Sequence, residues 1–276
     1  MKVYISSDME GSTGVASTAQ TDFKSPDYEF GRRMQLHDAL AAASAALESG
    51  AESVLVNDAH GRMTNLDPGR FPEGVQIISG SPKILGMVEG VSGCDVALFV
   101  GYHAMAGTEK AVLDHTYDSR VVYSLKVNGY LMGETGLNAL FCGALGVPVG
   151  LVTGDRAVCL EAASLLGQGL ETCEVKEGAG RCAAFTLPVP VTAKMIASSV
   201  KQTLANAAAG KCPKLEMKAP YTMEVAFHTT EQADEAGLVP GSERISGRSL
   251  VFHTEDIFEL RRWFNSALDV CESLPR

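Results

Sequence analysis

Side chains that can bind a metal stand directly after apolar runs of the sequence. Asp8 and Glu10 lie two positions apart in SSDMEG, His60 lies in NDAHG, and His103 lies in GYHAMAG. A further acid, Glu134, lies in MGETGLNA, where a helix is expected to start. Three carboxylates and two imidazoles form a nitrogen and oxygen donor set that suits Zn²⁺ better than Mn²⁺, Co²⁺ or Fe²⁺.

The number of donors indicates the kind of metal site. Five exceed the needs of one catalytic zinc ion, which usually takes three protein ligands and a water molecule. They suit two metal ions about 3.5–4 Å apart that share a carboxylate and a water molecule. In an extended segment, positions i and i+2 point to the same side, so Asp8 and Glu10 can meet while Met9 packs behind them.

Each residue also has a simpler interpretation. An acid after a strand is more often a turn residue or a helix cap, and a loop histidine is more often solvated. The joint pattern is what favours a metal site. His115, in the polar loop AVLDHTYDSR, could be a general acid or base, an oxyanion stabiliser or a solvated residue. Asn57, Asp58 and Asn138 lie beside the motifs and could orient the histidine ligands.

Strands and helices that would position these residues alternate in the first half of the chain. Short apolar runs predict strands at residues 2–7, 52–58, 74–80, 94–104 and 147–154. Helical spacing and capping signals predict helices at residues 28–49, 81–91 and 134–146, with another starting near residue 155. This order is typical of an α/β fold whose mostly parallel sheet is flanked by helices. Ligands bind such sheets outside the carboxyl ends of the strands.

The last part of the chain predicts a smaller α+β lobe. We expect a helix, a linker, two strands and a final helix at residues 191–209, 210–220, 222–229, 248–254 and about 255–273. An Asn-Gly turn predicts a hairpin at residues 122–133. We therefore expect an α/β metal-binding catalytic domain at residues 1–180 and the α+β lobe at residues 181–276.

Composition argues against several classes of partner. The 276 residues include 23 basic and 33 acidic side chains, a net charge of −10, without a basic run. This balance argues against nucleic acid and anionic membrane surfaces as partners.

The N-terminus lacks a signal-peptide pattern, and no apolar run approaches the roughly 18 residues of a membrane span. The seven scattered cysteines form no Cys-x-x-Cys pair and predict reduced thiols in a cytoplasmic protein.

The motifs together resemble a known family. SSDMEG, VNDAHG, GYHAMAG, the lone His115 and GETGLNA stand in the order seen in the zinc-dependent D-aminopeptidases of the DppA type, peptidase family M55. The resemblance covers nearly the whole chain. It includes the tail, where EVAFHTTEQADEAGLVPGSERISGRSLVF is similar to the C-terminal strands of the family.

The resemblance implies a metal centre, an assembly and a reaction. The ligands of two zinc ions per subunit would be Asp8, Glu10, His60, His103 and Glu134. Asp8 would bridge the ions, and His115 would act close to the scissile bond. Two stacked rings of five subunits each would form a homodecamer that encloses the active sites. Members of the family release N-terminal D-amino acids, notably D-Ala, from short peptides and amides.

Three functions remain open at this point. The leading hypothesis is a dinuclear zinc aminopeptidase. Another metal-dependent amidohydrolase, peptidase or phosphoesterase could use the same residues. The absence of a basic cluster near the motifs argues against a phosphate substrate. A non-catalytic peptide-binding protein of the same fold is the third hypothesis, and the presence of all five ligand residues argues against it.

Overall fold

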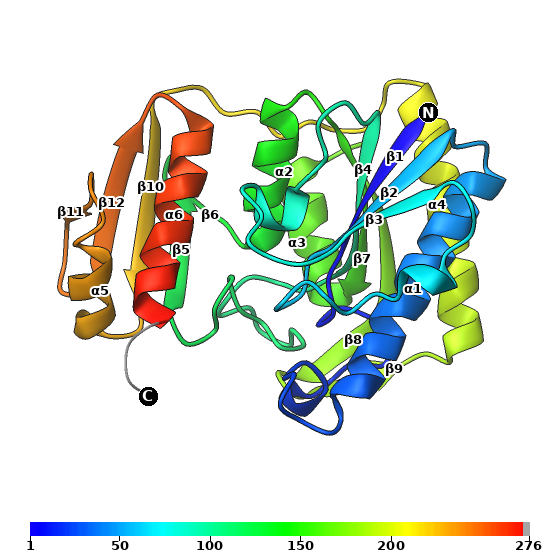
Figure 1. Ribbon diagram of the computed structural model, residues 1–276, viewed down its shortest axis with the longest axis horizontal. Helices are drawn as coiled ribbons and strands as arrows, with labels where there is room; N and C mark the ends of the chain where they lie inside the picture. Colours follow the sequence, from blue (N-terminus) through cyan, green and yellow to red (C-terminus); the bar gives the residue numbers. More distant parts are fainter. Residues whose placement is uncertain (273–276) are drawn as a thin grey trace.

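A seven-stranded sheet forms the larger of two units in the computed structural model, which describes residues 1–272 (Figure 1). Its order is β3–β2–β1–β4–β7–β8–β9, and every neighbouring pair is parallel except β8 and β9. The strands are β1 (Lys2–Ser7), β2 (Ser53–Asp58), β3 (Val75–Ile78), β4 (Val96–Tyr102), β7 (Val149–Asp155), β8 (Glu171–Gly180) and β9 (Ala183–Thr186).

Burial on both faces explains the sequence of the central strands. All residues of β4 and β7 are buried, as are all but the first of β1. Such strands carry continuous apolar runs, because helices cover both faces of a parallel sheet. The polar residues that end these strands therefore lie at one edge of a rigid, dry platform.

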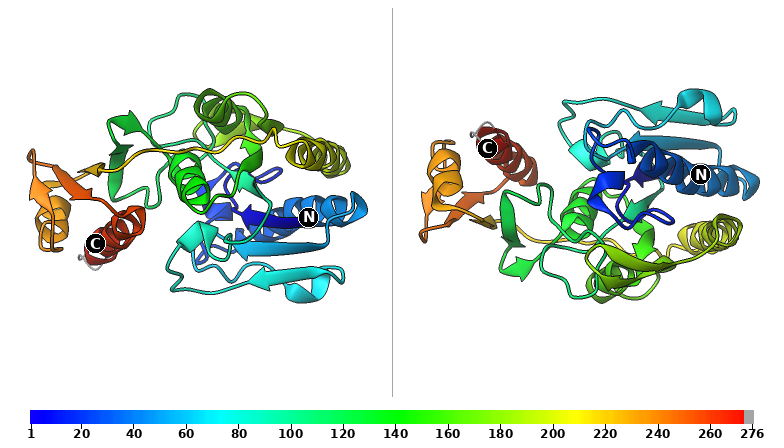
Figure 2. Two further views of the ribbon diagram at one scale, coloured as in Figure 1. Left: turned by 90° about the horizontal axis from the view of Figure 1, so that it is seen from above. Right: turned by 90° about the horizontal axis from the view of Figure 1, so that it is seen from below.

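Four helices cover the larger sheet (Figure 2). On one face, α1 (Tyr28–Glu48) and α4 (Val189–Ala208) pack side by side, and on the other lie α2 (Glu134–Ala144) and α3 (Arg156–Leu166). Alanines at the buried positions of α1 allow it to pack closely on the sheet. The side chain of Asp155 caps α3 by accepting a hydrogen bond from Val158 N at 2.9 Å.

The smaller unit is a five-stranded sheet in the order β11–β12–β10–β5–β6, antiparallel throughout. Its elements are β5 (Val122–Val127), β6 (Tyr130–Leu131), β10 (Tyr221–Phe227), α5 (Thr230–Ala236), β11 (Glu243–Arg244), β12 (Ser249–Thr254) and α6 (Ile257–Glu272). The expected fold class, a mostly parallel α/β sheet with a smaller α+β part, is confirmed. The division of the chain near residue 180 stays a prediction about domains; the smaller sheet takes strands from both sides of that point.

The structure differs from the expected elements in several places. The helix expected at residues 81–91 is wrong, since only a short 3-10 turn, η3 (Gly86–Val88), forms there. Gly86 and Gly90 have φ values of 54° and 82°, which a right-handed helix cannot accommodate. Strands β8, β9 and β11 and helix α5 were not predicted, nor were the short turns η1 (Thr18–Gln20) and η2 (Pro68–Arg70). Residue 273, the expected last residue of the final helix, lies outside the described residues.

Candidate active site

The acids and histidines meet where the strand order of the larger sheet reverses. From β1 the chain proceeds outward through β2 and β3, and it then returns to β4 on the other side of β1. Such a switch point leaves a crevice outside the carboxyl ends of the two central strands. Asp8 and Glu10 follow β1, His60 follows β2, and His103 follows β4. The sequence pattern and the topology therefore lead to the same place.

A tight turn after β1 holds the two acids. Residues 9–12 form a bend and a turn, so the expected extended geometry is wrong and the turn itself directs Asp8 and Glu10 together. The Asp8 N–H donates to Val100 O, and the Gly11 N–H donates to Gly101 O, both at 2.8 Å. A side chain at position 11 would lie 1.7 Å from a main-chain oxygen of the neighbouring strand, so only glycine fits. Met9 is fully buried behind the pair, as expected.

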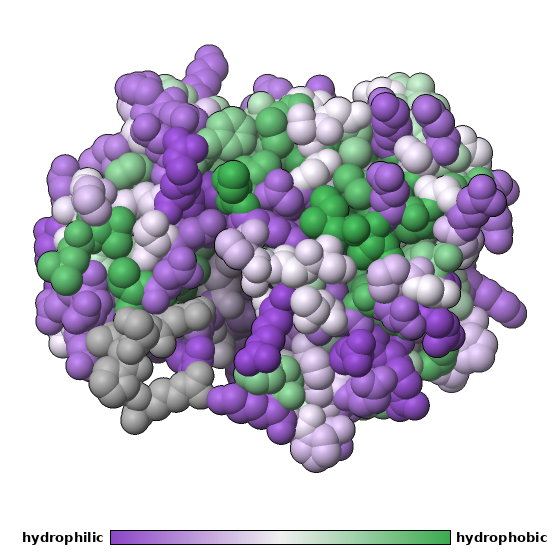
Figure 3. All heavy atoms as spheres, viewed as in Figure 1, coloured by the Kyte–Doolittle hydropathy of each residue, from purple (hydrophilic) through white to green (hydrophobic). Residues whose placement is uncertain are grey.

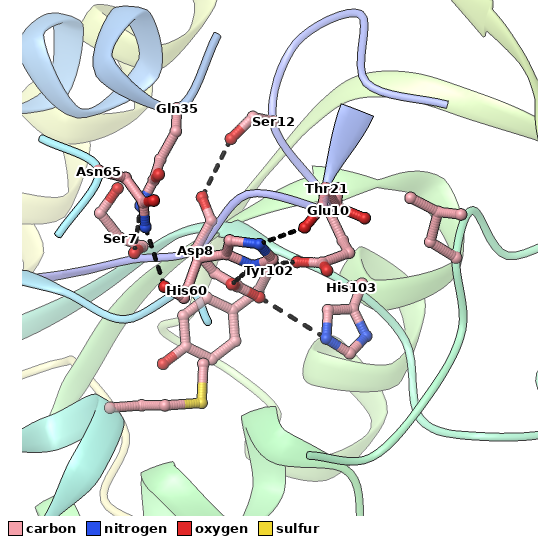
Figure 4. A network of polar contacts seen from close by, with 12 residues as sticks. Ser7, Asp8, Glu10, Ser12, Thr21, Gln35, His60, Asn65, Tyr102 and His103 are labelled. Atoms are coloured by element: carbon pink, nitrogen blue, oxygen red, sulfur yellow. Dashed lines mark hydrogen bonds and ion pairs between the residues drawn. The ribbon is translucent and has the colours of Figure 1, made fainter. Parts of the chain in front are cut away.

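His60 lies against both acids. Its Nδ1 is 3.0 Å from Oε2 of Glu10 and 3.4 Å from Oδ1 of Asp8 (Figure 4). Its Nε2–H donates to the main-chain oxygen of Thr21 at 3.0 Å, which leaves Nδ1 free to bind a metal. Asp58, at the end of β2, accepts hydrogen bonds from main-chain N–H groups of the loop that follows and so fixes the loop carrying His60.

His103 lies across from His60, on the other side of Asp8. Its Nε2 is 3.6 Å from Oδ2 of Asp8 and 3.3 Å from Oε1 of Glu134. Its Nδ1–H donates to Ala104 O at 3.0 Å, which again leaves the inward nitrogen free. Glu134 is the first residue of α2, as expected from MGETGLNA, and it also accepts from the Tyr117 N–H at 2.7 Å.

His115 completes the cluster from the loop after β4. Its Nε2 is 3.6 Å from Oε1 of Glu134, and its Nδ1–H donates to Leu113 O at 2.8 Å. The structure thus brings all six predicted site residues together. In each histidine one N–H is bound to a main-chain carbonyl and the other nitrogen faces the carboxylates, an arrangement typical of metal-binding histidines.

The ionisation of the cluster reflects burial opposed by charge pairing. Burial, followed by the charge of Glu10, raises the pKa of Asp8 to about 7. Burial alone would lower the pKa of His103, but Glu134 and Asp8 raise it to about 10, and the acids around His60 raise its pKa well above the usual range. Burial alone would raise the pKa of Glu10, but His60 lowers it. The charged forms of the acids and of the imidazoles therefore stabilise one another in a site that is shielded from water.

Buried atoms without hydrogen bonds indicate that these residues fit a metal. Among residues 1–272, Oδ2 of Asp8, Oε2 of Glu10 and Nε2 of His103 are buried and make no hydrogen bond. These atoms face other members of the cluster at 3.0–3.6 Å as charge pairs, and buried polar atoms without hydrogen bonds are costly unless a ligand satisfies them. Single donor atoms of Asp8, Glu10 and His103 lie within 4.8 Å of one another, and so do those of His103, His115 and Glu134. His103 can bind only one ion through its free Nε2, but two donor groups that lie side by side suit two neighbouring ions.

All residues of the cluster except His103 line a cavity of about 620 Å³. Loops from the larger unit line it, together with Arg261 from α6 of the smaller unit. This volume is within the range of small-molecule sites. The site can therefore admit a short peptide or a molecule of similar size.

Sequence reasoning missed three residues that support or line the site. Lys176, on the unpredicted strand β8, is buried and donates to the main-chain oxygens of Glu10 and Ser12 at 2.5 and 2.9 Å. Tyr117 binds Glu134 through its N–H and Asn138 through its hydroxyl. Arg261 lies far along the chain in α6. Nothing local in the sequence indicated that Lys176 or Arg261 would reach the site.

Comparisons with known proteins agree with this site and fold. The profile of the D-aminopeptidase family, peptidase M55, matches residues 1–266. A D-aminopeptidase of Bacillus subtilis (strain 168) is 34% identical over 263 residues, which are 94% of this chain and 93% of that protein. A solved structure, described as the Zn-dependent D-aminopeptidase DppA from Bacillus subtilis, a self-compartmentalizing protease, matches with a TM-score of 0.95 and 31% identity over 100% of both chains.

These matches define an aminopeptidase, a hydrolase that acts on peptide bonds. The chain belongs to peptidase family M55, the D-aminopeptidases. The family expected from the motifs is therefore confirmed.

Proposed function

We propose that the protein is a dinuclear zinc aminopeptidase that releases N-terminal D-amino acids, notably D-Ala, from short peptides and amides. The proposed ligands are Asp8, Glu10, His60, His103 and Glu134. The observation that carries the proposal is the convergence of these side chains with three buried donor atoms left without a hydrogen bond. The family and its zinc-dependent relative support both the metal and the reaction.

Asp8 is the proposed bridging ligand because its two oxygens face different histidines. Oδ1 lies toward His60 and Oδ2 toward His103. Glu10 and His60 would complete one side of the centre, and Glu134 and His103 the other. When bound, zinc polarises a peptide carbonyl and makes water nucleophilic at neutral pH.

His115 is the proposed catalytic residue. Burial, followed by the charge of His103, lowers its pKa, so its ring is neutral at physiological pH. Because its Nδ1–H is bound to Leu113 O, its Nε2 is free to accept or return a proton, or to face the oxygen of the attacked carbonyl. A free α-amine of the substrate would bind a zinc ion or a nearby carboxylate, as an aminopeptidase requires.

We further propose that the chain acts in the cytoplasm as a homo-oligomer, a decamer of two stacked rings. Large apolar side chains are exposed on the described surface, among them Ile84 at 70%, Phe185 at 70% and Leu238 at 76%. Figure 3 shows hydrophobic residues grouped over the larger unit among hydrophilic ones on one face. Exposed apolar groups support self-association. No helix in residues 1–272 is long and apolar enough to cross a bilayer. Light scattering should give ten subunits, and a monomeric mass would contradict the assembly.

Initial rates on D-Ala-D-Ala and L-Ala-L-Ala test the function. The protein is assayed as purified, after chelation and after zinc is restored. We expect zinc-restorable hydrolysis of the D,D peptide and little of the L,L peptide. Hydrolysis of the L,L peptide alone would contradict the D-specificity. Hydrolysis of neither, with zinc bound, would contradict peptidase activity on these substrates and favour a binding role.

A further inference from the structure

Arg261 is a buried cation without an acidic partner. It belongs to α6, and this helix lies on the side of the smaller unit that faces the larger one (Figure 1). The residue is 3% exposed, and its Nε and Nη1 groups make no hydrogen bond. No carboxylate of residues 1–272 lies within 4.0 Å of its guanidinium. A buried charge without an opposite charge, and with two of its donors unused, is costly, so an anion is expected to offset it.

Aromatic rings and a glycine hold the guanidinium in place. Its central carbon lies 4.8 Å from the ring centroid of Tyr117 and 5.7 Å from that of Phe141. The ring of Tyr117 in turn packs edge-on against the ring of Phe264, which belongs to α6 like Arg261, with the ring centroids 5.0 Å apart. A side chain added at Gly86 would lie 2.1 Å from Nη2 of Arg261, so the arginine occupies space that only glycine leaves open. The donors are thus presented in a fixed position.

The same cavity is lined by Arg261 and by four of the proposed metal ligands, Asp8, Glu10, His60 and Glu134. Tyr117 connects them, because its ring lies under the guanidinium while its N–H donates to Glu134. The other arginines that line the cavity already have acidic partners. Arg120 pairs with Asp118 at 2.6 Å, and Arg181 pairs with Asp114 at 3.1 Å. Arg261 is therefore the arginine of this cavity, among the described residues, that lacks a carboxylate.

The two ends of a short peptide match two different parts of the cavity. A free peptide carries an ammonium group at one end and a carboxylate at the other. In an aminopeptidase the metal centre acts on the bond next to the N-terminal amine, which leaves the carboxylate end of a short peptide for a cation elsewhere in the cavity. The fork of N–H groups on arginine fits a carboxylate in a bidentate manner.

We infer that Arg261 binds the C-terminal carboxylate of the peptide substrate and thereby makes the enzyme prefer very short peptides with a free C-terminus. This inference rests on the proposed function. An acid supplied by a second copy of the chain is the competing partner for Arg261, and the experiment below separates the two.

The test compares D-Ala-D-Ala with the same dipeptide amidated at its C-terminus. The two substrates share the scissile bond and the α-amine, and they differ in the terminal charge. For the zinc-loaded wild type we expect kcat/KM to be about tenfold or more higher for the free peptide, because charged hydrogen bonds are worth this much. Most of the difference should lie in KM, since the contact exists before the reaction.

Arg261→Met should reduce this ratio of kcat/KM values to near one. Arg262→Met is the matched control: Arg262 is the next residue of α6, its side chain is 57% exposed, and it pairs with Asp256 at 3.4 Å. It should keep the wild-type ratio. Arg261→Lys, which keeps the charge but loses the fork, should give an intermediate ratio. Thermal unfolding of each variant reports whether it folds.

A wild-type ratio near one would overturn the inference without any variant, as would an unchanged ratio in Arg261→Met. Either result would assign Arg261 to a subunit contact or to packing. These outcomes leave the proposed function intact, because both peptides are still hydrolysed. If the zinc-loaded wild type hydrolyses neither peptide, the proposed function fails and the inference fails with it.

Discussion

The imidazole rings of His103 and His115 stack with their centroids 3.9 Å apart and their planes 10° from parallel. Two positive rings at this separation repel, so they do not carry charge together. The acids near His103 hold the charge there, and the pKa of His115 is lowered by burial and then by that charge. The stack therefore separates a histidine that pairs with carboxylates from one that stays neutral.

His115→Ala should keep the metal and lose the reaction. We expect kcat to fall by about 10²–10⁴-fold, the usual contribution of a general acid or base. Metal analysis should still find the wild-type zinc content. If zinc is lost along with activity, His115 is a ligand. His115, His103 and Glu134 are close enough to share an ion, so the metal content decides the matter.

His60→Ala and Glu10→Ala should abolish both zinc binding and turnover while the sheet stays folded. The side chains project from loops beyond the strands, and the strands themselves remain packed. Zinc content, initial rate and circular dichroism check the three parts of this prediction. His253→Ala is the control, because His253 is exposed on β12 in the smaller unit, where its side chain is hydrogen-bonded to Thr222. An active His60→Ala variant with full zinc content would contradict the ligand assignment.

The metal-free protein should become less stable as the pH rises from 6.5 to 8. The folded-state pKa of His103 is about 10 and that of His60 is also raised, against 6.5 for an ordinary histidine. Their stabilisation is therefore complete below pH 6.5 and is lost as the pH rises toward the folded pKa values. His103 alone should lower the free energy of unfolding by about 1–2 kcal/mol over this interval, and His60 should add to the fall.

Urea unfolding at both pH values measures this change. The interval ends at pH 8 because the pKa of Lys176 and of Lys83 is lowered to about 8 by burial, and lysines with lowered pKa oppose the trend above it. Zinc-loaded protein should show a smaller fall, since metal-bound imidazoles are neutral. Stability that rises between pH 6.5 and 8 in the metal-free protein would contradict the assignment.

Lys176→Met should loosen the turn that carries the two acids. The Lys176 ammonium group donates to the main-chain oxygens of Glu10, Ser12 and Val15 at 2.5–2.9 Å. Without it these oxygens lose their donor, and we expect a loss of about 2–4 kcal/mol of stability and weaker zinc binding. Lys126→Met, a half-exposed lysine paired with Glu224, should change stability by less than about 0.5 kcal/mol. Equal zinc affinity in both variants would contradict the role of Lys176.

The strands that carry the site could be predicted from the sequence because their signals are local. Val3, Tyr4 and Ile5 form a continuous apolar run, and Asp8 and Glu10 interrupt it where the strand ends. The same reasoning places His60 and His103 at the sheet edge. The switch point itself is a property of strand order, which apolar runs do not encode.

Other features depend on contacts between distant segments. Strand β8 reads as a charged stretch, and the fold alone shows that Lys176 points inward to the turn after β1. Arg261 reaches the cavity because α6 packs near η3 and α2, from which it is separated by more than a hundred residues of chain. The helix expected at residues 81–91 illustrates a different error. Local capping signals favoured a helix there, but two glycines in this segment adopt positive φ values that end it.

A zinc titration of the metal-free protein tests the dinuclear centre most directly. Bound zinc and the initial rate on D-Ala-D-Ala are measured at each addition. The account predicts that binding saturates at two zinc ions per subunit and that the rate reaches its maximum only with the second. Saturation and full activity at one zinc ion per subunit would contradict the shared role of Asp8 between His60 and His103.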